Sequence, residues 1–498
     1  MSFGPPPSIY TESAQSADRT RARRRGRLLG GAAAVVAAAA LVAGAVALWP
    51  SAGAGDDAKS AAAVKQAPDE VRETHETAPA SPEGEPAVQH NEGELTAGTR
   101  YGPGLWATDK FVVRGVASRL EGYRIAPGQD DTAWSLKLDG HICAVSRDMT
   151  ADHRTAVVIQ PPHPGAAAGK GICDQVVFVD LDTGRKLWQR KMPGADFAYV
   201  TNTDLALAKG VVAIAWGHGS VAYDMASGKK LWNTSTGACQ DQGYAGGRAL
   251  LALVKCGQSG DAAYRVQRLD ARTGKPRWTY QVSQGVQGAY LPSADPPVLA
   301  VEAGDIDVTD LITLDGTNGR RRATISMSGY EPLCGSTGFS GPFFGVVDKC
   351  PGLVVGRDRL YVMSKESDEI DEPANRVVAF DVQKGTTASK FEGRPFQNVV
   401  PLRADGDDLI LYRRSIDEVQ PAAVVAWNSR TDREVPYLLF HVPEDDEGAL
   451  SDPEQGQIVY EHGHVFFAAR EMERDGKRPK SPVLSVLGRG VGGTEALR

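Results

Sequence analysis

Few side chains in this 498-residue sequence have both the type and the spacing that chemistry requires. Two histidines, His462 and His464, stand at positions i and i+2, a spacing that puts both side chains on one face of a strand, where they could hold a metal ion. Chance placement of the two residues in a loop between strands explains the same pattern and is favoured. We therefore predict no metal ligand.

Two acidic runs, at residues 366–372 and 444–447, could offer oxygen ligands to calcium. They lack the regular alternation of oxygen ligands with glycine that a calcium loop needs, so we interpret them as solvated loops. The Gly-Thr-Asn-Gly segment at residues 316–319 is too short to cradle a phosphate group. The sequence also contains no nucleophile elbow, zinc-protease histidine pair or Walker loop. We predict no catalytic and no cofactor-binding residue.

The sequence has six cysteines, which are Cys143, Cys173, Cys239, Cys256, Cys334 and Cys350. No two of them stand in a Cys-x-x-Cys pair, which disfavours a structural metal site. An even number of cysteines in a chain directed out of the cytoplasm predicts disulfides instead. Their clustering favours bonds between neighbours along the chain: Cys143 with Cys173, Cys239 with Cys256, and Cys334 with Cys350.

The N-terminal part of the chain predicts a membrane anchor. Residues 28–49 carry no charge, and as a helix they would span roughly 30 Å of hydrocarbon. Six arginines lie within residues 1–27 and predict a cytoplasmic tail, with the chain after the helix outside the cytoplasm. A cleaved signal peptide is the alternative, although its apolar core is usually shorter, at about 7–15 residues. Both interpretations place most of the chain outside the cytoplasm, and the anchor places it at the cell membrane.

Residues 50–100 are rich in Ala, Pro, Glu, Ser and Gly and have almost no large apolar side chains. Such a segment buries too little surface to offset its ordering entropy, so we predict a disordered linker. The formal net charge is −7 at pH 7 although the tail is basic, so the region after the anchor is acidic. An acidic domain does not attract a phosphate backbone, which argues against nucleic acid as a partner.

A repeated hairpin dominates the remaining residues, 101–498. Each repeat has an Asp or Asn at its turn, at Asp180, Asp224, Asp270, Asp315, Asp381 and Asn428, and these positions are 44, 46, 45, 66 and 47 residues apart. A glycine follows four residues later in the first five repeats, at Gly184, Gly228, Gly274, Gly319 and Gly385. A tryptophan ends the first three, at Trp188, Trp232 and Trp278.

Each part of this repeat has a physical role. The short Asp side chain bonds the amides of the turn, glycine supplies a positive φ, and the next strand returns as a hairpin. Two further β-rich runs precede each hairpin, such as residues 197–201 and 211–216 before Asp224. Four strands in about 45 residues is the period of a propeller blade, and a tryptophan is suited to fill the space between blades. We predict an all-β propeller of eight blades, with seven as the alternative, closed by a strand from residues 95–106.

The Asp-x-x-Thr-Gly-x-x-x-Trp pattern resembles the repeat of the pyrroloquinoline-quinone-like propellers. The resemblance covers roughly residues 100–498 and weakens where Ala323, Ser389 and Pro436 replace the tryptophan. The resemblance implies an eight-bladed propeller, and together with the predicted anchor it suggests a membrane-anchored bacterial member of that family. In the quinoprotein dehydrogenases the quinone lies between a tryptophan and a disulfide of adjacent cysteines. No two cysteines are adjacent in this sequence, so we expect no cofactor.

The long interval between Asp315 and Asp381 contains an insertion that holds Cys334 and Cys350. Its Gly-, Pro- and Phe-rich part, residues 338–344, is a candidate recognition loop, although a decoration without function explains it equally well. We predict a monomeric, non-catalytic scaffold, binding or sensor module. Its partner would be an envelope protein or a small ligand on a propeller face. A quinone-dependent dehydrogenase and a carbohydrate-acting propeller enzyme are the alternatives.

Overall fold

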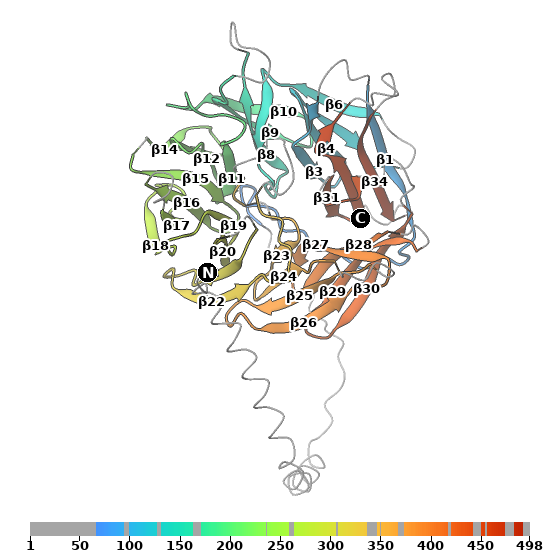
Figure 1. Ribbon diagram of the computed structural model, residues 1–498. Coiled ribbons are helices and arrows are strands. Elements are labelled where there is room, and N and C mark those ends of the chain that lie inside the picture. The colour runs from blue at the N-terminus through green and yellow to red at the C-terminus, as the bar shows by residue number, and fades with distance from the viewer. Residues whose placement is uncertain are drawn as a thin grey trace, which may run out of the picture. The chain divides into compact units, whose positions relative to one another are not determined.

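The computed structural model describes residues 66–491 apart from residues 94–98, 127–130, 163–170, 236, 258–262, 305–306, 336–345, 349, 367–372, 417–419, 442–449, 454–455 and 474–482. The chain divides into two units, residues 1–66 and 67–498, and the second unit is a ring of β-sheets (Figure 1). The predicted tail and the predicted membrane helix lie outside the described residues. Within the described residues, no helix combines the length and the apolar character needed to cross a membrane.

Eight four-stranded antiparallel sheets form the blades, which confirms the predicted eight-bladed all-β propeller. Blade 1 contains β3 (Gly104–Ala107), β4 (Phe111–Val116), β5 (Arg119–Arg124) and β6 (Thr132–Lys137). Blade 2 contains β7 (His141–Val145), β8 (Arg154–Gln160), β9 (Gln175–Asp180) and β10 (Arg185–Lys191). Blade 3 contains β11 (Asp204–Ala208), β12 (Val211–Ala215), β13 (Ser220–Asp224) and β14 (Lys230–Thr234). Blade 4 contains β15 (Cys239–Ala245), β16 (Leu250–Cys256), β17 (Ala263–Leu269) and β18 (Pro276–Gln281).

The second half of the ring repeats this arrangement. Blade 5 contains β19 (Gly288–Ala294), β20 (Pro297–Glu302), β21 (Asp310–Leu314) and β22 (Arg321–Ser326). Blade 6 contains β23 (Leu353–Val355), β24 (Arg359–Met363), β25 (Arg376–Asp381) and β26 (Thr387–Glu392). Blade 7 contains β27 (Gln397–Asp405), β28 (Asp408–Ser415), β29 (Ala422–Asn428) and β30 (Arg433–Phe440). Blade 8 contains β31 (Gly456–Glu461), β32 (His464–Ala469), β34 (Val483–Val491) and β1 (Gly84–Glu92). Two short strands, β2 (Arg100–Tyr101) and β33 (Glu471–Met472), pair separately.

Blade 8 closes the ring by joining the two ends of the described chain. Strand β1 pairs with β34, with Gly84 opposite Val491 and Glu92 opposite Val483. The predicted linker over residues 50–100 is therefore wrong for this segment, and so is the predicted closing strand over residues 95–106. As an outer strand, β1 buries few large apolar side chains, among them Val88, and its composition consequently resembles that of a linker.

The predicted hairpin turns form in the six repeats. The side-chain oxygen of each Asp or Asn accepts backbone amides of its turn at 2.8–3.1 Å. The five glycines have φ values between 63° and 74°. One predicted strand is wrong, because residues 197–201 form turns and the first strand of blade 3 is β11.

Each repeat tryptophan packs against the turn of the next blade. The Trp188 Nε1 donates to the Met225 carbonyl at 2.7 Å, and the Trp232 Nε1 donates to the Ala271 carbonyl at 2.8 Å. Trp278 makes the corresponding bond to the Gly316 carbonyl at 2.9 Å. These bonds join one blade to the next and satisfy the indole N–H that burial would otherwise leave unpaired. The tryptophan is therefore the connection between blades that the repeat predicts.

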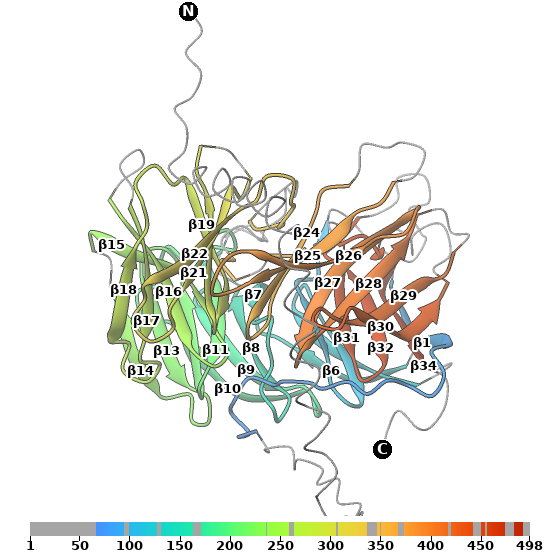
Figure 2. The same ribbon diagram turned by 90° about the horizontal axis from the view of Figure 1, so that it is seen from below.

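The ring has two faces. The turns between the first and second strands and between the third and fourth strands form one face, which we call the turn face. The other connections within and between blades form the opposite face, which we call the loop face. Residues 67–76 lie along the turn face and we call them the strap. In Figure 2 the blue segment that begins with the strap runs from the side of β10 to β1 along one face of the ring.

Candidate functional site

Three described residues of the insertion between β22 and β23 lie at the centre of the ring. The first strands of the blades lie innermost, where they contact one another around the ring. Val346, Val347 and Asp348, which we call the plug, reach this centre: the Leu291 amide of β19 donates to the Val347 carbonyl at 2.7 Å. Val347 also packs against Gly243 of β15, where a Cβ atom would lie 2.7 Å from it. The plug thus occupies part of the centre of the ring.

Arg147 of blade 2 contacts the plug, although its side chain is 48% exposed. The Arg147 Nη1 donates to the Asp348 carbonyl at 2.6 Å, and its Nε lies 3.8 Å from the Asp348 carboxylate. Asp204, at the start of β11, accepts the Tyr244 amide at 2.8 Å. Burial, followed by the nearby charge of Asp348, raises the pKa of Asp204 well above its ordinary value. Asp204 and Asp348 are 2% and 6% exposed, so neither offers an open carboxylate to a bulky substrate.

The strap covers the turn-face end of the channel. Its Arg72 pairs with Asp109 of blade 1 at 2.8 Å, and its Glu76 pairs with Arg403 of blade 7 at 2.6 Å. Further hydrogen bonds and ion pairs join the strap to the turns of blades 2, 3, 4 and 8. Because one segment contacts six blades, it braces the turn face as a whole.

A cavity of about 500 Å³ remains at the centre. Aliphatic side chains form much of its lining, among them Leu105, Val354 and Ile458. Glu461, whose pKa is raised by burial, lies at its wall.

The residues present do not fit the pyrroloquinoline quinone of the dehydrogenases. That quinone rests on a disulfide of adjacent cysteines, whereas the most closely spaced pair here is 16 residues apart and no cysteine is free.

The three disulfides form between the predicted neighbours, Cys143–Cys173, Cys239–Cys256 and Cys334–Cys350. The second joins directly opposed residues of β15 and β16. The first ties β7 to the loop before β9, and the third ties the two ends of the insertion. All three disulfides lie at the loop-face end of their blades. They therefore stabilise the loops of that face.

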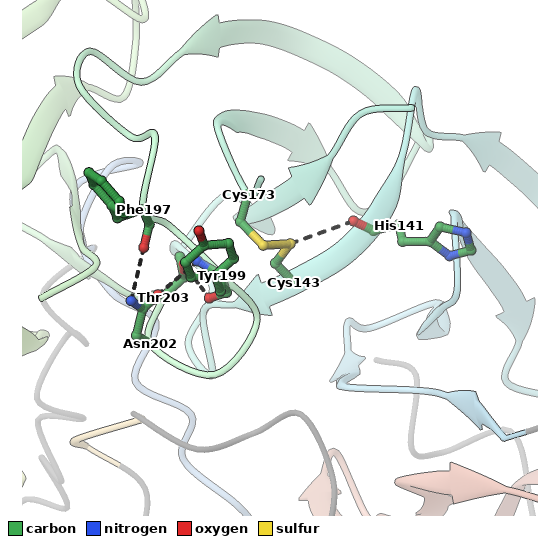
Figure 3. The surroundings of a disulfide bond; sticks show 7 residues. All are labelled: His141, Cys143, Cys173, Phe197, Tyr199, Asn202 and Thr203. Carbon is green, nitrogen blue, oxygen red and sulfur yellow. Dashed lines mark hydrogen bonds between the residues drawn. A yellow bond between two sulfur atoms is a disulfide. The ribbon is translucent and has the colours of Figure 1, made fainter. Parts of the chain in front are cut away.

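The first disulfide supports a loop with two exposed aromatic side chains, shown in Figure 3. Phe197 and Tyr199 lie in the connection between β10 and β11, and they are 56% and 42% exposed. With Ile416, they are the exposed large hydrophobic side chains among the residues that the structure describes. The Phe197 ring also contacts the His218 ring of the neighbouring loop, with 5.3 Å between the ring centroids. We call residues 193–203 the aromatic loop.

Hydrogen bonds hold the aromatic loop in one conformation. The Asn202 Nδ2 donates to the Phe197 carbonyl at 3.0 Å, and the Asn202 Oδ1 accepts the Tyr199 amide at 2.8 Å. The Thr203 hydroxyl donates to the Tyr199 carbonyl at 2.7 Å. Between the two aromatic residues, Ala198 is fully buried and its carbonyl accepts the Cys173 amide at 2.7 Å. The disulfide-bonded segment and the aromatic loop are therefore joined through this backbone bond.

Such an arrangement is suited to binding rather than to catalysis. Large exposed aromatic side chains on a pre-ordered loop supply apolar contact area, and binding then costs little ordering entropy. This site was not predicted, because residues 197–201 have the composition of a strand. An available signal was the alternation of small and aromatic residues with a nearby Asn-x-Asp, which fits a turn better than a strand.

The other predicted sites have varied outcomes. His462 and His464 do not converge on one point: the His462 Nε2 lies 2.8 Å from Asp109, whereas the His464 Nδ1 bonds the His462 carbonyl and its ring stacks on Phe466. The run at residues 444–447 and the candidate recognition loop at residues 338–344 lie outside the described residues. So does the run at residues 366–372, except for Glu366.

Eight four-stranded blades with a repeated turn and tryptophan define a β-propeller of the quinoprotein type. A family model described as outer membrane protein assembly factor BamB matches residues 73–250 and 173–435. The chain belongs to this family of pyrroloquinoline-quinone-like propellers. A search of curated proteins found no match.

Several solved structures are similar to this chain at low sequence identity. BamB from Moraxella catarrhalis is 13% identical, with a TM-score of 0.42 over 81% of this chain and 99% of that one. A quinohemoprotein alcohol dehydrogenase from Pseudomonas putida is 13% identical, with a TM-score of 0.48 over 82% of this chain and 76% of that one. The quinohemoprotein alcohol dehydrogenase from Comamonas testosteroni is 13% identical, with a TM-score of 0.44 over 83% and 77%. Likeness at this level of identity does not extend to function.

Proposed function

We propose that the protein is a membrane-anchored, extracytoplasmic binding module without catalytic activity of its own, and that its aromatic loop binds a protein of the cell envelope. The observation that carries this proposal is the braced pair Phe197 and Tyr199, which stay exposed although the surrounding loop is ordered. Aromatic side chains of this kind provide most of the binding free energy in many protein interfaces.

The position of the loop in the ring supports the proposal. The strap lies on the turn face. The aromatic loop lies on the opposite face, so the strap does not obstruct it. A central quinone site lacks its disulfide platform, and the carboxylates beside the plug are buried. These features favour recognition over either enzymatic alternative.

Photo-crosslinking in intact cells tests the proposed partner. A photoreactive phenylalanine analogue is placed at Phe197 in the full chain, and as a matched control at Lys384, an exposed turn residue of the opposite face. Irradiation is expected to produce one envelope protein adduct from position 197 and none from position 384. The adduct is then expected to be lost when Tyr199→Ala is added. Equal adducts from both positions, or an adduct that Tyr199→Ala leaves unchanged, would remove the aromatic loop as the binding site.

The anchor requires its own test. Deletion of residues 28–49 from a chain that keeps an independent export signal is expected to move the propeller from the membrane fraction to the soluble extracytoplasmic fraction. Protease added to intact cells is expected to digest the full-length protein from outside while sparing a tag at its N-terminus. A propeller protected from external protease would contradict the proposed topology.

A further inference from the structure

Three potential metal ligands meet where the ring closes. His90 and Glu92 lie on β1 in blade 8, and Glu121 lies on β5 in blade 1. One ligand atom from each of these side chains lies within 4.8 Å of the other two. The cluster therefore spans the junction between the last blade and the first blade.

One oxygen of Glu92 lacks a partner although the side chain is buried. Glu92 is 1% exposed, and its Oε2 accepts hydrogen bonds from Arg100 Nη1 at 2.7 Å and from Arg119 Nη2. Its Oε1 is buried and has no hydrogen-bond partner among the residues that the structure describes. A buried carboxylate oxygen without a donor is unfavourable and rare, so this oxygen calls for a partner such as a cation.

The other two ligands are held in position by neighbouring side chains. The Glu121 Oε2 accepts hydrogen bonds from Tyr123 OH at 3.0 Å and from Arg119 Nε at 2.9 Å. The His90 ring stacks on the Tyr123 ring with 4.3 Å between their centroids. Ligand side chains in metal sites are oriented by outer hydrogen bonds and packing of this kind. Tyr123 thus orients both Glu121 and His90.

The charges of the cluster tolerate an added cation. Arg100 and Arg119 balance the two carboxylates, so the cluster also stands as an ion-pair network without a metal. That network occupies only Oε2 of each carboxylate with arginine, and it leaves the Glu92 Oε1 unsatisfied. The arginine side chains are 27% and 32% exposed, so solvent can receive them when an ion binds. An ion-pair network alone therefore leaves the buried Glu92 Oε1 unexplained, whereas a cation site explains it.

We propose that His90, Glu92 and Glu121 form a binding site for a divalent transition-metal ion, Zn²⁺ in the first place. One imidazole nitrogen and two carboxylates suit Zn²⁺, whereas Ca²⁺ and Mg²⁺ prefer oxygen ligands alone. The bound ion would join β1 to β5. Because β1 completes blade 8, this joint would secure the closure of the ring.

Metal titration of the full chain, purified in detergent without a histidine tag and treated with chelator, tests the site. We expect one Zn²⁺ ion to bind per chain and to raise the melting temperature, with no comparable effect of Ca²⁺. Glu121→Gln and His90→Gln are expected to weaken Zn²⁺ binding by more than about tenfold and to remove the rise in melting temperature. Glu302→Gln is the matched control, because Glu302 also accepts a tyrosine hydroxyl, that of Tyr290 at 2.9 Å, but lies in blade 5.

Two ligand variants are used because one of them could fold poorly. His90→Gln is expected to fold, since His90 is only partly buried and this variant keeps both carboxylates. Zn²⁺ binding that survives in both variants would assign the ion to other histidines, such as His75 or His462, and would overturn the proposal. So would the absence of stoichiometric Zn²⁺ binding to the unaltered chain. Loss of binding in His90→Gln with retention in Glu302→Gln supports it.

Discussion

At the scale of single residues, the repeat works as a contact between two blades. The tryptophan of one blade covers the turn glycine of the next: Trp232 lies over Gly274, where a Cβ atom would come within 2.7 Å of the indole ring. Two requirements select glycine at position 274. Its φ of 69° disfavours other residues, and the indole of Trp232 occupies the space that a side chain would need. One position therefore determines both the turn and the packing between blades.

Gly274→Ala separates these two requirements. The left-handed backbone alone costs an alanine about 1–2 kcal/mol. Displacement of Trp232 adds an overpacking penalty of typically about 1–3 kcal/mol. Gly406→Ala is the matched control, because Gly406 has a φ of 60° and a Cβ atom added there would meet nothing within 4 Å. In denaturant unfolding, Gly274→Ala is expected to lose clearly more stability than Gly406→Ala. Equal losses would show that the tryptophan contact adds nothing.

Two aspartates of blade 3 predict pH effects of opposite sign. Burial and the charge of Asp348 raise the pKa of Asp204 in the folded protein above its pKa in the unfolded chain. The stability that Asp204 contributes is therefore fully present below the unfolded pKa, and it is lost as the pH rises through the folded pKa. Hydrogen bonds from Ser227 and Arg272 lower the pKa of Asp224, so its contribution is present above the unfolded pKa and is lost as the pH falls through the folded pKa.

Melting curves of the asparagine variants at pH 7 and near pH 4 check these signs. Asp204→Asn is expected to stabilise the protein at pH 7 by about 1–3 kcal/mol and to have little effect near pH 4. Asp224→Asn is expected to destabilise it at pH 7 by less than about 1 kcal/mol, with a smaller effect in acid. If Asp204→Asn destabilised the protein at pH 7, the negative charge of Asp204 would be a favourable part of the native structure.

At the scale of elements, the sequence predicts what depends on neighbours in the chain. The hairpins at Asp180, Asp224 and Asp270 follow from an Asp, a Gly and a Trp within nine residues, and the structure has them. The plug, the strap and β1 depend on partners far along the chain, such as Leu291 for Val347 and Val491 for Gly84. Segments of this kind have no periodicity that separates them from loops. The His90 cluster was missed for the same reason, whereas the aromatic loop was missed because residues 197–201 have the composition of a strand.

The disulfide beside the aromatic loop predicts a selective effect on binding. In the chain-entropy model, loss of Cys143–Cys173 or of Cys239–Cys256 costs a similar free energy, about 3–4 kcal/mol in each case. Only the first lies next to the aromatic loop through the bond between Cys173 and Ala198. The double variant Cys143→Ala/Cys173→Ala is therefore expected to lose the crosslink from position 197.

The matched variant Cys239→Ala/Cys256→Ala is expected to keep that crosslink at a temperature where both variants remain folded. Crosslinking yield and melting temperature are measured on the same two proteins. If both variants lost the crosslink to the same extent, general destabilisation rather than local bracing would explain the loss.

At the scale of the whole molecule, closure of the ring depends on a segment outside the repeats. Without β1, the edge of β34 would present unpaired backbone groups over residues 483–491, and exposed edges of this kind promote association between chains. The strap adds ion pairs and hydrogen bonds to six blades before the chain reaches β1. The compact unit therefore begins at Ala67, and we expect the cooperative folding unit to begin there rather than at residue 101.

Two truncated chains, residues 67–498 and residues 101–498, test this boundary under oxidising conditions. The longer chain keeps the strap and β1, so it is expected to elute as a monomer and to unfold in one cooperative transition. The shorter chain lacks both and is expected to aggregate or to melt at a lower temperature, because blade 8 then has three strands and an open edge. Adding a synthetic peptide of residues 84–92 is expected to restore part of the lost stability by pairing with β34, whereas a scrambled peptide is not. A monomeric shorter chain with an unchanged melting temperature would mean that the ring holds together without this strand.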